Sequence, residues 1–254
     1  MSQPQLLDTK TMDAMRTVVS QVDETPDERY ILDEYFKQRP CVNGDLASAT
    51  EATREPANNN FEILGTNATS DDVTFSETDA GLLLTCDGAD DDQIIILPHL
   101  DTLQSAWTGI KWGTENQTEW IGAIKTGAAV TTQLLWAGLK LTNTPVIATD
   151  ADQVFFRYST DDSDTTWHVI SSINGTDTNT TTTVTVAADT AYKFKVKINP
   201  DRTASCYIND VLVYTTAALK NDIDFIPYIG VQALDTAAPT LIVNYEKISR
   251  ILFE

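Results

Sequence analysis

Basic residues, histidine and cysteine are all scarce in this chain of 254 residues. Its 17 Lys and Arg face 37 Asp and Glu, which gives a formal net charge of −20 at pH 7. A chain this acidic repels phosphate backbones and anionic lipid surfaces, so we expect it to bind neither nucleic acid nor membrane. The two histidines and three cysteines, with no Cys-x-x-Cys spacing, argue against a zinc site or a disulfide framework.

Long hydrophobic runs are also missing. No apolar stretch reaches the roughly 18 residues of a membrane-spanning helix, and the first ten residues, MSQPQLLDTK, lack the apolar segment of a secretory signal. We therefore expect synthesis in a reducing cytoplasm, where the three thiols stay free. The length allows one large domain or two small ones, with enough chain for a core.

Threonine and aspartate are abundant instead. The chain has 37 Thr and 26 Asp but only 11 Glu. Threonine favours strands, and aspartate favours turns over helix interiors. The composition therefore indicates a mainly β fold with many turns.

Residues 1–60 differ from the rest and predict a helical N-terminal arm. The sequence Thr25-Pro26-Asp27-Glu28 is a capping box, which predicts a helix that ends before Pro40. Residues 44–60 are small and polar and predict a linker. Because short helices bury little surface by themselves, we expect the arm to dock on a partner. The expected docking residues are Leu6, Leu7, Met12, Met15, Val18, Val19, Tyr30, Ile31, Tyr35 and Phe36.

Residues 61–254 predict short strands separated by turns. The segment 192–198 alternates apolar residues with lysines, which predicts a strand with one buried face. Asn209-Asp210 between two apolar runs predicts a hairpin, and the Thr-rich stretch 174–185 predicts an exposed edge strand. The full set of predicted strands is 61–66, 73–75, 81–85, 93–97, 105–112, 119–125, 133–141, 153–159, 166–172, 181–186, 191–198, 203–208, 211–215, 229–233 and 240–252. Their spacing predicts an antiparallel two-sheet jelly-roll sandwich.

The order of motifs from residue 153 to residue 250 supports a more specific interpretation. In sequence these motifs are Val154-Phe155-Phe156-Arg157-Tyr158, Trp167, Asn174-Gly175, the threonine run 180–183, Tyr207-Ile208-Asn209-Asp210 and Leu241-Ile242-Val243-Asn244-Tyr245. This order resembles the concanavalin A-like (lectin/glucanase) jelly roll of the kind found in structural proteins of tailed bacteriophages. The resemblance implies a two-sheet fold and no particular activity, because the fold serves lectins, glucanases and inert virion parts.

Catalytic patterns are weak, and we expect no enzyme. The glucanase branch of the resembled fold carries Glu-x-Asp-x-x-Glu, whereas Glu115 and Glu119 here have a different spacing and no third acid. His99 and His168 do not accompany a nucleophile elbow. The many aspartates are interpreted as turn and surface residues.

Three kinds of binding site remain as hypotheses. Trp112 and Trp120 flank a loop that contains Asn116, so they are the candidate glycan contacts, the alternative being that all five tryptophans pack in the core. The acidic turns 87–92 and 161–164 are interpreted as hydrated turns, with a weak structural calcium site as the alternative. No other cofactor is expected.

These observations together predict a non-enzymatic structural protein of a bacteriophage virion. The expected role is a capsid decoration or cement protein, made in the host cytoplasm and placed on the outer capsid surface. Its expected partners are the major capsid protein and copies of itself, with a trimer favoured because it matches local capsid symmetry. The alternatives are a carbohydrate-binding, lectin-like module on the particle surface and a tail or fibre component. A carbohydrate-active enzyme ranks below both.

Overall fold

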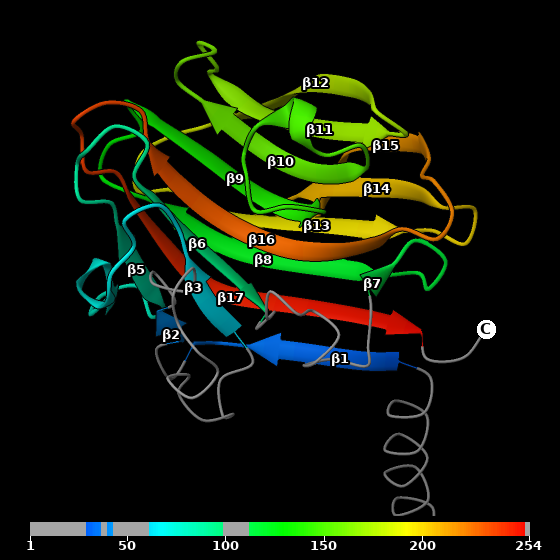
Figure 1. Ribbon diagram of the computed structural model, residues 1–254, viewed down its shortest axis with the longest axis horizontal. Helices are drawn as coiled ribbons and strands as arrows, with labels where there is room; N and C mark the ends of the chain where they lie inside the picture. The colour runs from blue at the N-terminus through cyan, green and yellow to red at the C-terminus, as the bar shows by residue number, and fades with distance from the viewer. Residues whose placement is uncertain (1–28, 37–39, 43–60, 99–111, 252–254) are drawn as a thin grey trace, which may run out of the picture.

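Two β-sheets, one of eight strands and one of nine, stack face to face to form a sandwich (Figure 1). Their strands pair antiparallel, except that Cys41–Val42 pairs in parallel with Phe61–Leu64. The computed structural model describes residues 29–36, 40–42, 61–98 and 112–251. Within these ranges the only helical elements are two short 3-10 turns, η2 (Ser70–Asp72) and η3 (Ile147–Thr149). None of the described segments is a helix of the length and apolarity that crossing a bilayer requires. The mainly β, two-sheet prediction is therefore confirmed.

The eight-stranded sheet carries both described ends of the chain. In spatial order it consists of β15 (Val211–Ala218), β14 (Thr203–Ile208), β13 (Ala191–Ile198), β8 (Glu119–Thr126), β17 (Thr240–Ile251), β5 (Leu82–Thr85) and β4 (Val73–Phe75), with β1 (Arg29–Glu34) also paired to β17. Strand β17 is long enough to pair with β5 along its first half and with β1 along its second half.

The nine-stranded sheet covers the other side of the core. Its order is β12 (Thr176–Thr185), β11 (Thr166–Ile173), β10 (Gln153–Ser159), β9 (Gln133–Lys140), β16 (Asp224–Ala233), β6 (Gln93–Pro98), β3 (Phe61–Leu64) and β2 (Cys41–Val42), with β7 (Trp112–Gly113) also paired to β16. The Thr-rich strand β12 lies at the edge of the sheet and is exposed along most of its length, which confirms the predicted edge strand.

Strand alternation explains why the two sheets stack. In β13 the residues Tyr192, Phe194, Val196 and Ile198 are buried, and the intervening lysines point outward, as the sequence predicts. Aromatic rings from both sheets meet at the centre of the sandwich. Phe194 lies 4.6 Å from Phe156 of β10 and 4.7 Å from Trp167 of β11, measured between ring centroids. These contacts bury large apolar surfaces and fix the sheets against each other.

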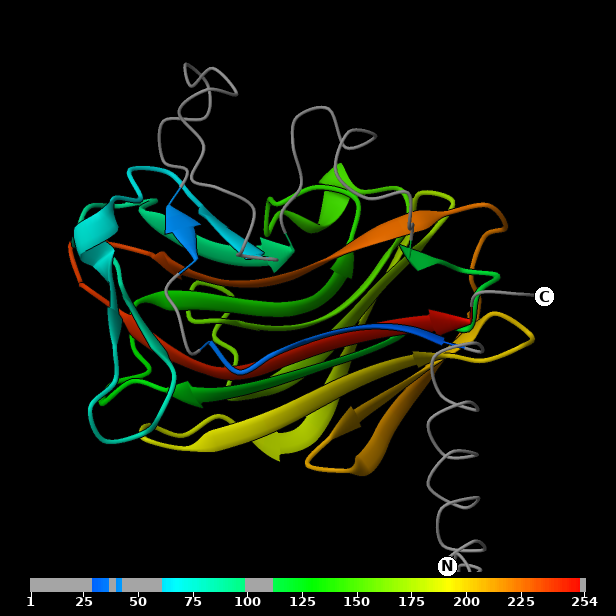
Figure 2. The same cartoon turned by 90° about the horizontal axis from the view of Figure 1, so that it is seen from below.

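Figure 2 shows that both sheets bend in the same direction, so that the outer face of the nine-stranded sheet lies on the inside of the bend. This concave outer face is unusually apolar for the outside of a sandwich. A second hydrophobic cluster occupies it, distinct from the core between the sheets, and consists of Ile95, Leu97, Trp136, Phe155, Ile170, Ile226 and Tyr228. The outer face of the eight-stranded sheet lies on the convex side and carries mostly polar residues.

The helix predicted to end before Pro40 is wrong over residues 29–34, which form strand β1. Tyr30 and Leu32 point towards the core, and Phe36, just after the strand, is 2% exposed and packs edge-on against Phe61. Ile31 and Tyr35 point outward. If residues 29–34 formed a helix, the backbone N–H and C=O groups along the second half of β17 would stay unpaired at the sheet edge. Pairing with β1 satisfies these groups, and the free energy gained outweighs the local preference of the capping box for a helix. Residues assigned by sequence to a separate arm thus belong to the sandwich.

Candidate functional site

A row of side chains crosses the concave outer face of the nine-stranded sheet at the level of Trp136. Cross-strand partners in an antiparallel sheet share one face, so register alone places them together. Trp136 of β9 is the partner of Arg157 of β10, and Arg157 is the partner of His168 of β11. On the other side of Trp136 the partner is Gly230 of β16. We call Trp136, Arg157 and His168 the concave row.

Gly230 provides the space in which the Trp136 ring lies. A Cβ atom at Gly230 would come within 2.3 Å of the indole ring, so any side chain there would displace the tryptophan. Trp136 itself is 1% exposed. Its indole Nε1–H has no hydrogen-bond acceptor among the described residues. A buried donor of this kind costs free energy unless something accepts from it.

Arg157 is the second donor of the concave row. Its Nη2 group bonds the Asp162 carboxylate, which belongs to the loop between β10 and β11. Burial lowers the pKa of Arg157, and the nearby Asp164 carboxylate acts in the opposite direction. The Arg157 side chain is 9% exposed, and its Nε–H finds no acceptor in the described part of the chain. Two neighbouring buried donors are therefore unused.

His168 lies between the buried part of the concave row and the protein surface. Its Nε2 atom lies 3.2 Å from Asp164 Oδ1, and its Nδ1 atom lies 2.7 Å from Asn179 Oδ1 of the edge strand β12. Asn179 is exposed, and the Asp162 side chain is 56% exposed. The concave row is thus buried at Trp136 and opens to solvent beside the β10–β11 loop.

A buried ion pair lies on the same face, at Lys140, four residues beyond Trp136 on β9. Lys140 Nζ is 3.1 Å from Asp150 Oδ2, and neither side chain is exposed. Lys140 also donates to Gln153 Oε1 and lies 4.3 Å above the centre of the Phe155 ring. Burial lowers the pKa of Lys140, an effect that Asp150 opposes. Because every one of these groups has a partner, the cluster holds the 141–152 connection on the sheet and does not offer a free reactive group.

The convex outer face of the eight-stranded sheet gathers basic residues in an otherwise acidic chain. The outward positions of three adjacent strands carry five lysines, which we call the lysine stripe: Lys193, Lys195, Lys197, Lys125 and Lys247. Lys195 Nζ lies 4.9 Å above the Tyr207 ring and 3.9 Å from Glu119 Oε2. The stripe is therefore mixed with aromatic and acidic side chains.

Large apolar side chains flank the lysine stripe on the same face. Leu212 of the edge strand β15 is the partner of Tyr207 and is 52% exposed. On the opposite side Ile31 is 40% and Tyr35 is 59% exposed, and the Tyr35 ring packs 4.6 Å from that of Tyr245. A sheet face with lysines between exposed apolar residues has the composition of a protein-binding surface.

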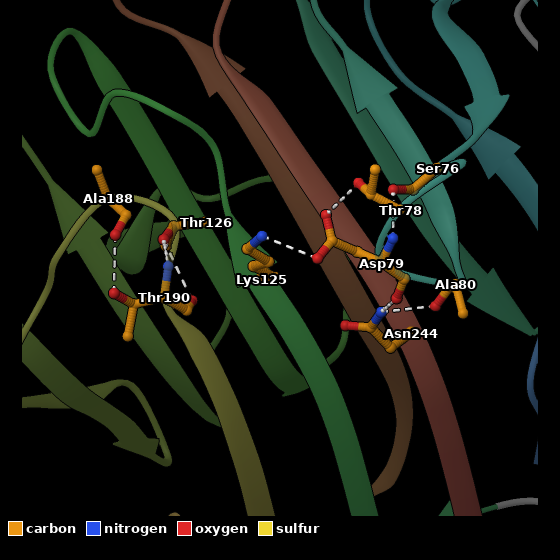
Figure 3. A network of polar contacts seen from close by, with 9 residues as sticks. All are labelled: Ser76, Thr78, Asp79, Ala80, Lys125, Thr126, Ala188, Thr190 and Asn244. Carbon is orange, nitrogen blue, oxygen red and sulfur yellow. Dashed lines mark hydrogen bonds and ion pairs between the residues drawn. The ribbon is translucent and has the colours of Figure 1, made fainter.

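Several polar contacts lie at one end of the convex face (Figure 3). Asp79, in the turn between β4 and β5, accepts a hydrogen bond from Lys125 Nζ at 2.9 Å. The Asn244 side-chain amide of β17 donates to the backbone carbonyls of Asp79 and Ala80. On the neighbouring strand, Thr126 donates its hydroxyl to the Thr190 carbonyl. The bonds from Lys125 and Asn244 hold the turn between β4 and β5 against the sheet.

The sequence-predicted glycan contacts do not form an exposed platform. Trp120 is fully buried and Trp112 is 5% exposed, and both belong to the core between the sheets. The Trp120 indole Nε1–H donates to the buried Glu246 carboxylate at 2.8 Å. Asn116 is half-buried, and its carbonyl accepts from the backbone N–H of Ile251. Alternation in β8 places Trp120 on its inward side, which the loop-flanking position of this residue did not indicate.

The predicted docking residues divide into three groups. Tyr30 and Phe36 face the core, whereas Ile31 and Tyr35 are exposed on the convex face. The remaining predictions lie outside the described residues: Leu6, Leu7, Met12, Met15, Val18 and Val19.

The acidic turns have partners within the protein. Asp92 accepts from the Asn67 side chain and from the backbone N–H of Ala89. In the other turn, Asp162 and Asp164 bond Arg157 and His168. In the described ranges no group of three or more His, Cys, Asp or Glu side chains is placed to hold a metal ion.

A family model described as "SO2946-like, C-terminal domain" matches residues 103–223. The solved structure of SO2946 from Shewanella oneidensis MR-1, a protein of unknown function, is similar along nearly the whole length. It has a TM-score of 0.58 at 13% identity and covers 98% of this chain and 97% of that chain. A search of curated proteins gives no match.

Enzymes and lectins are also among the structural neighbours. A family 7 alginate lyase, A1-II′, solved with its substrate, has a TM-score of 0.51 at 11% identity and covers 74% of this chain and 84% of that chain. The carbohydrate recognition domain of Emp46p has a TM-score of 0.50 at 8% identity and covers 74% of this chain and 87% of that chain. The concanavalin A-like fold is therefore shown. It does not decide between an enzyme and a binding protein.

Proposed function

We propose that this protein is a non-enzymatic structural component of a bacteriophage particle, most simply a capsid decoration or cement protein. It attaches to other virion proteins through the convex face of its eight-stranded sheet. The observation that carries the proposal is the lysine stripe flanked by exposed Ile31, Tyr35 and Leu212. The motif order from residue 153 to residue 250 resembles jelly rolls of tailed-phage structural proteins, and this resemblance supports a role in a bacteriophage particle.

The charge distribution supports attachment by this face. A net charge of −20 keeps densely arranged copies soluble and mutually repelling, while the lysine stripe provides the complementary sign for an acidic partner surface. Many weak contacts on a repeating lattice add up by avidity, so no single contact has to be strong. The major capsid protein is the proposed partner, and self-association as a trimer would match local capsid symmetry.

Quantitative mass spectrometry of purified virus particles tests the role directly. One copy per shell subunit, or one per few, supports decoration. A handful of copies per particle assigns the chain to the tail or a fibre instead. Absence from the particles overturns the structural proposal.

Charge reversal on the lysine stripe tests the attachment face. The double variant Lys195→Glu/Lys247→Glu is expected to bind particles lacking this protein at least about tenfold more weakly, because two favourable charge pairs become repulsive. Tyr35→Ala is expected to weaken binding without affecting the core, since its ring is 59% exposed. Co-sedimentation of purified protein with the particles measures both effects.

Lys220→Glu is the matched control for the same change of charge. Lys220 is exposed in the connection between β15 and β16, outside the stripe, so its reversal should leave sedimentation unchanged. Equal loss of binding in this control would indicate a general charge effect and contradict the attachment face. The melting temperature of Lys220→Glu should stay within a few degrees of the parent protein, because surface substitutions rarely change stability by more than about 0.5 kcal/mol. The melting temperature of the double variant is measured beside it, because Lys195→Glu also places a second carboxylate near Glu119.

Carbohydrate binding is the second candidate function, and the concave row favours it. The unused donors of Trp136 and Arg157 belong to β9 and β10 of the nine-stranded sheet. The outer face of this sheet lies opposite the attachment face (Figure 2). A particle protein attached by its convex side would present this concave face outward. The lectin and lyase neighbours share the fold that frames such a face.

A further inference from the structure

We infer that two copies of this chain pair through the outer edge of β12, so that their nine-stranded sheets become one continuous sheet. The contact needs no particle, so the inference does not depend on the proposed function. Strand β12 ends the sheet, and its only pairing partner in the described ranges is β11 (Figure 1). An exposed strand edge offers a row of backbone donors and acceptors to another strand.

The hairpin at the start of β12 determines which residues offer these groups. Asn174-Gly175 is a two-residue turn with positive φ at both positions, and Ile173 and Thr176 flank it as partners. The residues that flank such a turn are hydrogen-bonded to each other. Hydrogen-bonded and non-hydrogen-bonded pairs then alternate along an antiparallel hairpin. The pattern of free backbone groups in β12 follows from this starting point.

Three residues of β12 direct their backbone N–H and C=O groups away from β11, and we call them the free edge: Asp177, Asn179 and Thr181. The residues between them, Thr178 and Thr180, use the same groups to bond β11. All three free-edge residues are exposed, and the register with β11 is unbroken from residue 176 to residue 181. This part of the edge is therefore regular enough to accept another strand.

The neighbouring edge strand of the other sheet is less suited to pairing. Strand β15, which contacts β12, has two register shifts against β14, whereas the single shift of β12 falls after Thr181. Bulges bend a strand and interrupt its row of free groups, which protects an edge. Strand β12 also contains neither proline nor lysine, the residues that commonly protect edges.

Charge favours a second copy of the chain as the partner. Each copy has a net charge of −20, so most surfaces of two copies repel each other. Residues 178–185 contain no charged side chain, and Asp177 is the single charge of β12. Two copies can therefore approach along this edge at a lower electrostatic cost than along an acidic surface.

An antiparallel register centred on Asn179 uses the whole free edge. It pairs Asn179 with the same residue of the second copy, and Asp177 of each copy with Thr181 of the other. Each hydrogen-bonded pair exchanges two bonds, so the contact forms about six backbone hydrogen bonds. Registers centred on residue 178 or 180 use only two of the three residues. A two-fold contact closes with two copies, so it is separate from the trimer considered for the particle.

The side chains are compatible with this register. Asp177 lies opposite the Thr181 hydroxyl, which can donate to its carboxylate. The two Asp177 residues are four positions apart along the strand pair, about 13 Å, which exceeds the roughly 8 Å screening length at physiological ionic strength. Asn179 Oδ1 already lies 2.7 Å from His168 Nδ1, so the Asn179 amide group is left to donate across the axis.

Sedimentation equilibrium of the purified full chain over a concentration series tests the pairing. We expect a reversible monomer–dimer equilibrium. Asn179→Lys should weaken dimerisation about three- to tenfold, because like charges directly opposite each other destabilise a strand pair. Thr183→Lys is the matched control, since it makes the same change of charge at an exposed position of β12 beyond the free edge. It should leave the dimer unchanged.

A mixture of two variants tests the two-fold axis itself. Asn179→Asp should also weaken dimerisation, by repulsion between two carboxylates. An equimolar mixture of Asn179→Lys and Asn179→Asp should recover it, because each ammonium group then faces a carboxylate. Only a residue on the axis meets its own copy, so a mixture that dimerises no better than either variant alone contradicts the register.

Hydrogen exchange of the unmodified protein keeps the test independent of variant stability. The amide protons of the free edge should exchange rapidly in dilute solution and become protected at concentrations where the dimer forms. Those of Thr178 and Thr180 should be protected in both conditions. A monomer at every concentration, or a trimer whose free-edge amides still exchange rapidly, overturns the pairing. So does a dimer that Asn179→Lys leaves intact or that Thr183→Lys weakens equally.

Discussion

Replacing Asp150 with alanine is expected to cost about 3 to 5 kcal/mol of unfolding free energy, because it leaves the buried Lys140 ammonium without its counter-charge. Lys140→Met should cost clearly less. Without Lys140, the Asp150 carboxylate still accepts from the backbone N–H groups of Leu141 and Thr142 and from the Thr142 hydroxyl. Urea unfolding of the three proteins at pH 7 measures this asymmetry.

The Asp150→Ala penalty should also decrease at high pH. Burial lowers the pKa of Lys140 in the folded protein, and Asp150→Ala removes the group that opposes this shift. Between the lowered folded pKa and the unfolded value of 10.5 the folded variant therefore binds fewer protons than the unfolded one, so its stability rises with pH over a wider window than that of the parent protein. Asp79→Ala is the matched control, because it breaks the partly exposed Lys125 pair, which water and salt screen, and it should cost clearly less than Asp150→Ala. Equal losses of unfolding free energy in Asp150→Ala and Asp79→Ala would show that the buried Lys140–Asp150 pair contributes no more to stability than the partly exposed pair.

Glu246→Gln is expected to stabilise the protein at alkaline pH. Glu246 is fully buried between the sheets, and burial raises its pKa to about 8, although the hydrogen bond from Trp120 opposes the shift. The other carboxyl oxygen, Oε2, has no partner in the described ranges. Glutamine retains an acceptor for Trp120 and never ionises.

The direction of the pH effect follows from the proton count. Between the unfolded pKa of 4.5 and the folded value of about 8, the folded protein holds a proton that the unfolded chain releases. This contribution to stability is therefore lost as pH rises through that window, by on the order of 5 kcal/mol in total. Glu246→Gln should match the parent protein near pH 5 and exceed it increasingly up to pH 8 and above.

Thermal unfolding from pH 5 to pH 9 measures the difference between the two proteins. Glu119→Gln, on the partly exposed outward side of β8, is the control, because it makes the same substitution at a glutamate that is not buried between the sheets. A Glu246→Gln profile parallel to that of the parent would mean that Glu246 is ionised in the folded state throughout.

Most strands from residue 61 onward were predictable, because alternation and turn residues are local signals. The predicted boundaries of β4, β10, β13 and β14 coincide with the observed ones. Strand β1 was missed for a physical reason. The capping box at residues 25–28 favours a helix locally, whereas the strand is stabilised by β17, more than 200 residues further along. Such a partner leaves no mark on the local sequence pattern.

The candidate sites were less predictable than the fold. Strand periodicity assigns alternate faces but does not say which side is inside, so Trp120 could be placed in a strand and still be misjudged as exposed. The concave row had a usable signal in Arg157, a charged residue in the otherwise apolar strand Val154-Phe155-Phe156-Arg157-Tyr158. Its neighbours Trp136 and His168 emerge only from the registers of two hairpins.

The pairing of β1 with β17 gives the molecule a direction in which it resists pulling. Arg29 and Ile251 are partners, and the Arg29 guanidinium bonds the Gln117 carbonyl and the Ser249 hydroxyl at that end. A force applied between Arg29 and Ile251 would therefore peel β1 from β17, breaking one residue pair at a time. A pull on Arg29 directed along the strand, against a tether elsewhere on the sandwich, would load all six pairs in shear. Mechanical resistance at this strand thus depends on where the opposing load is applied.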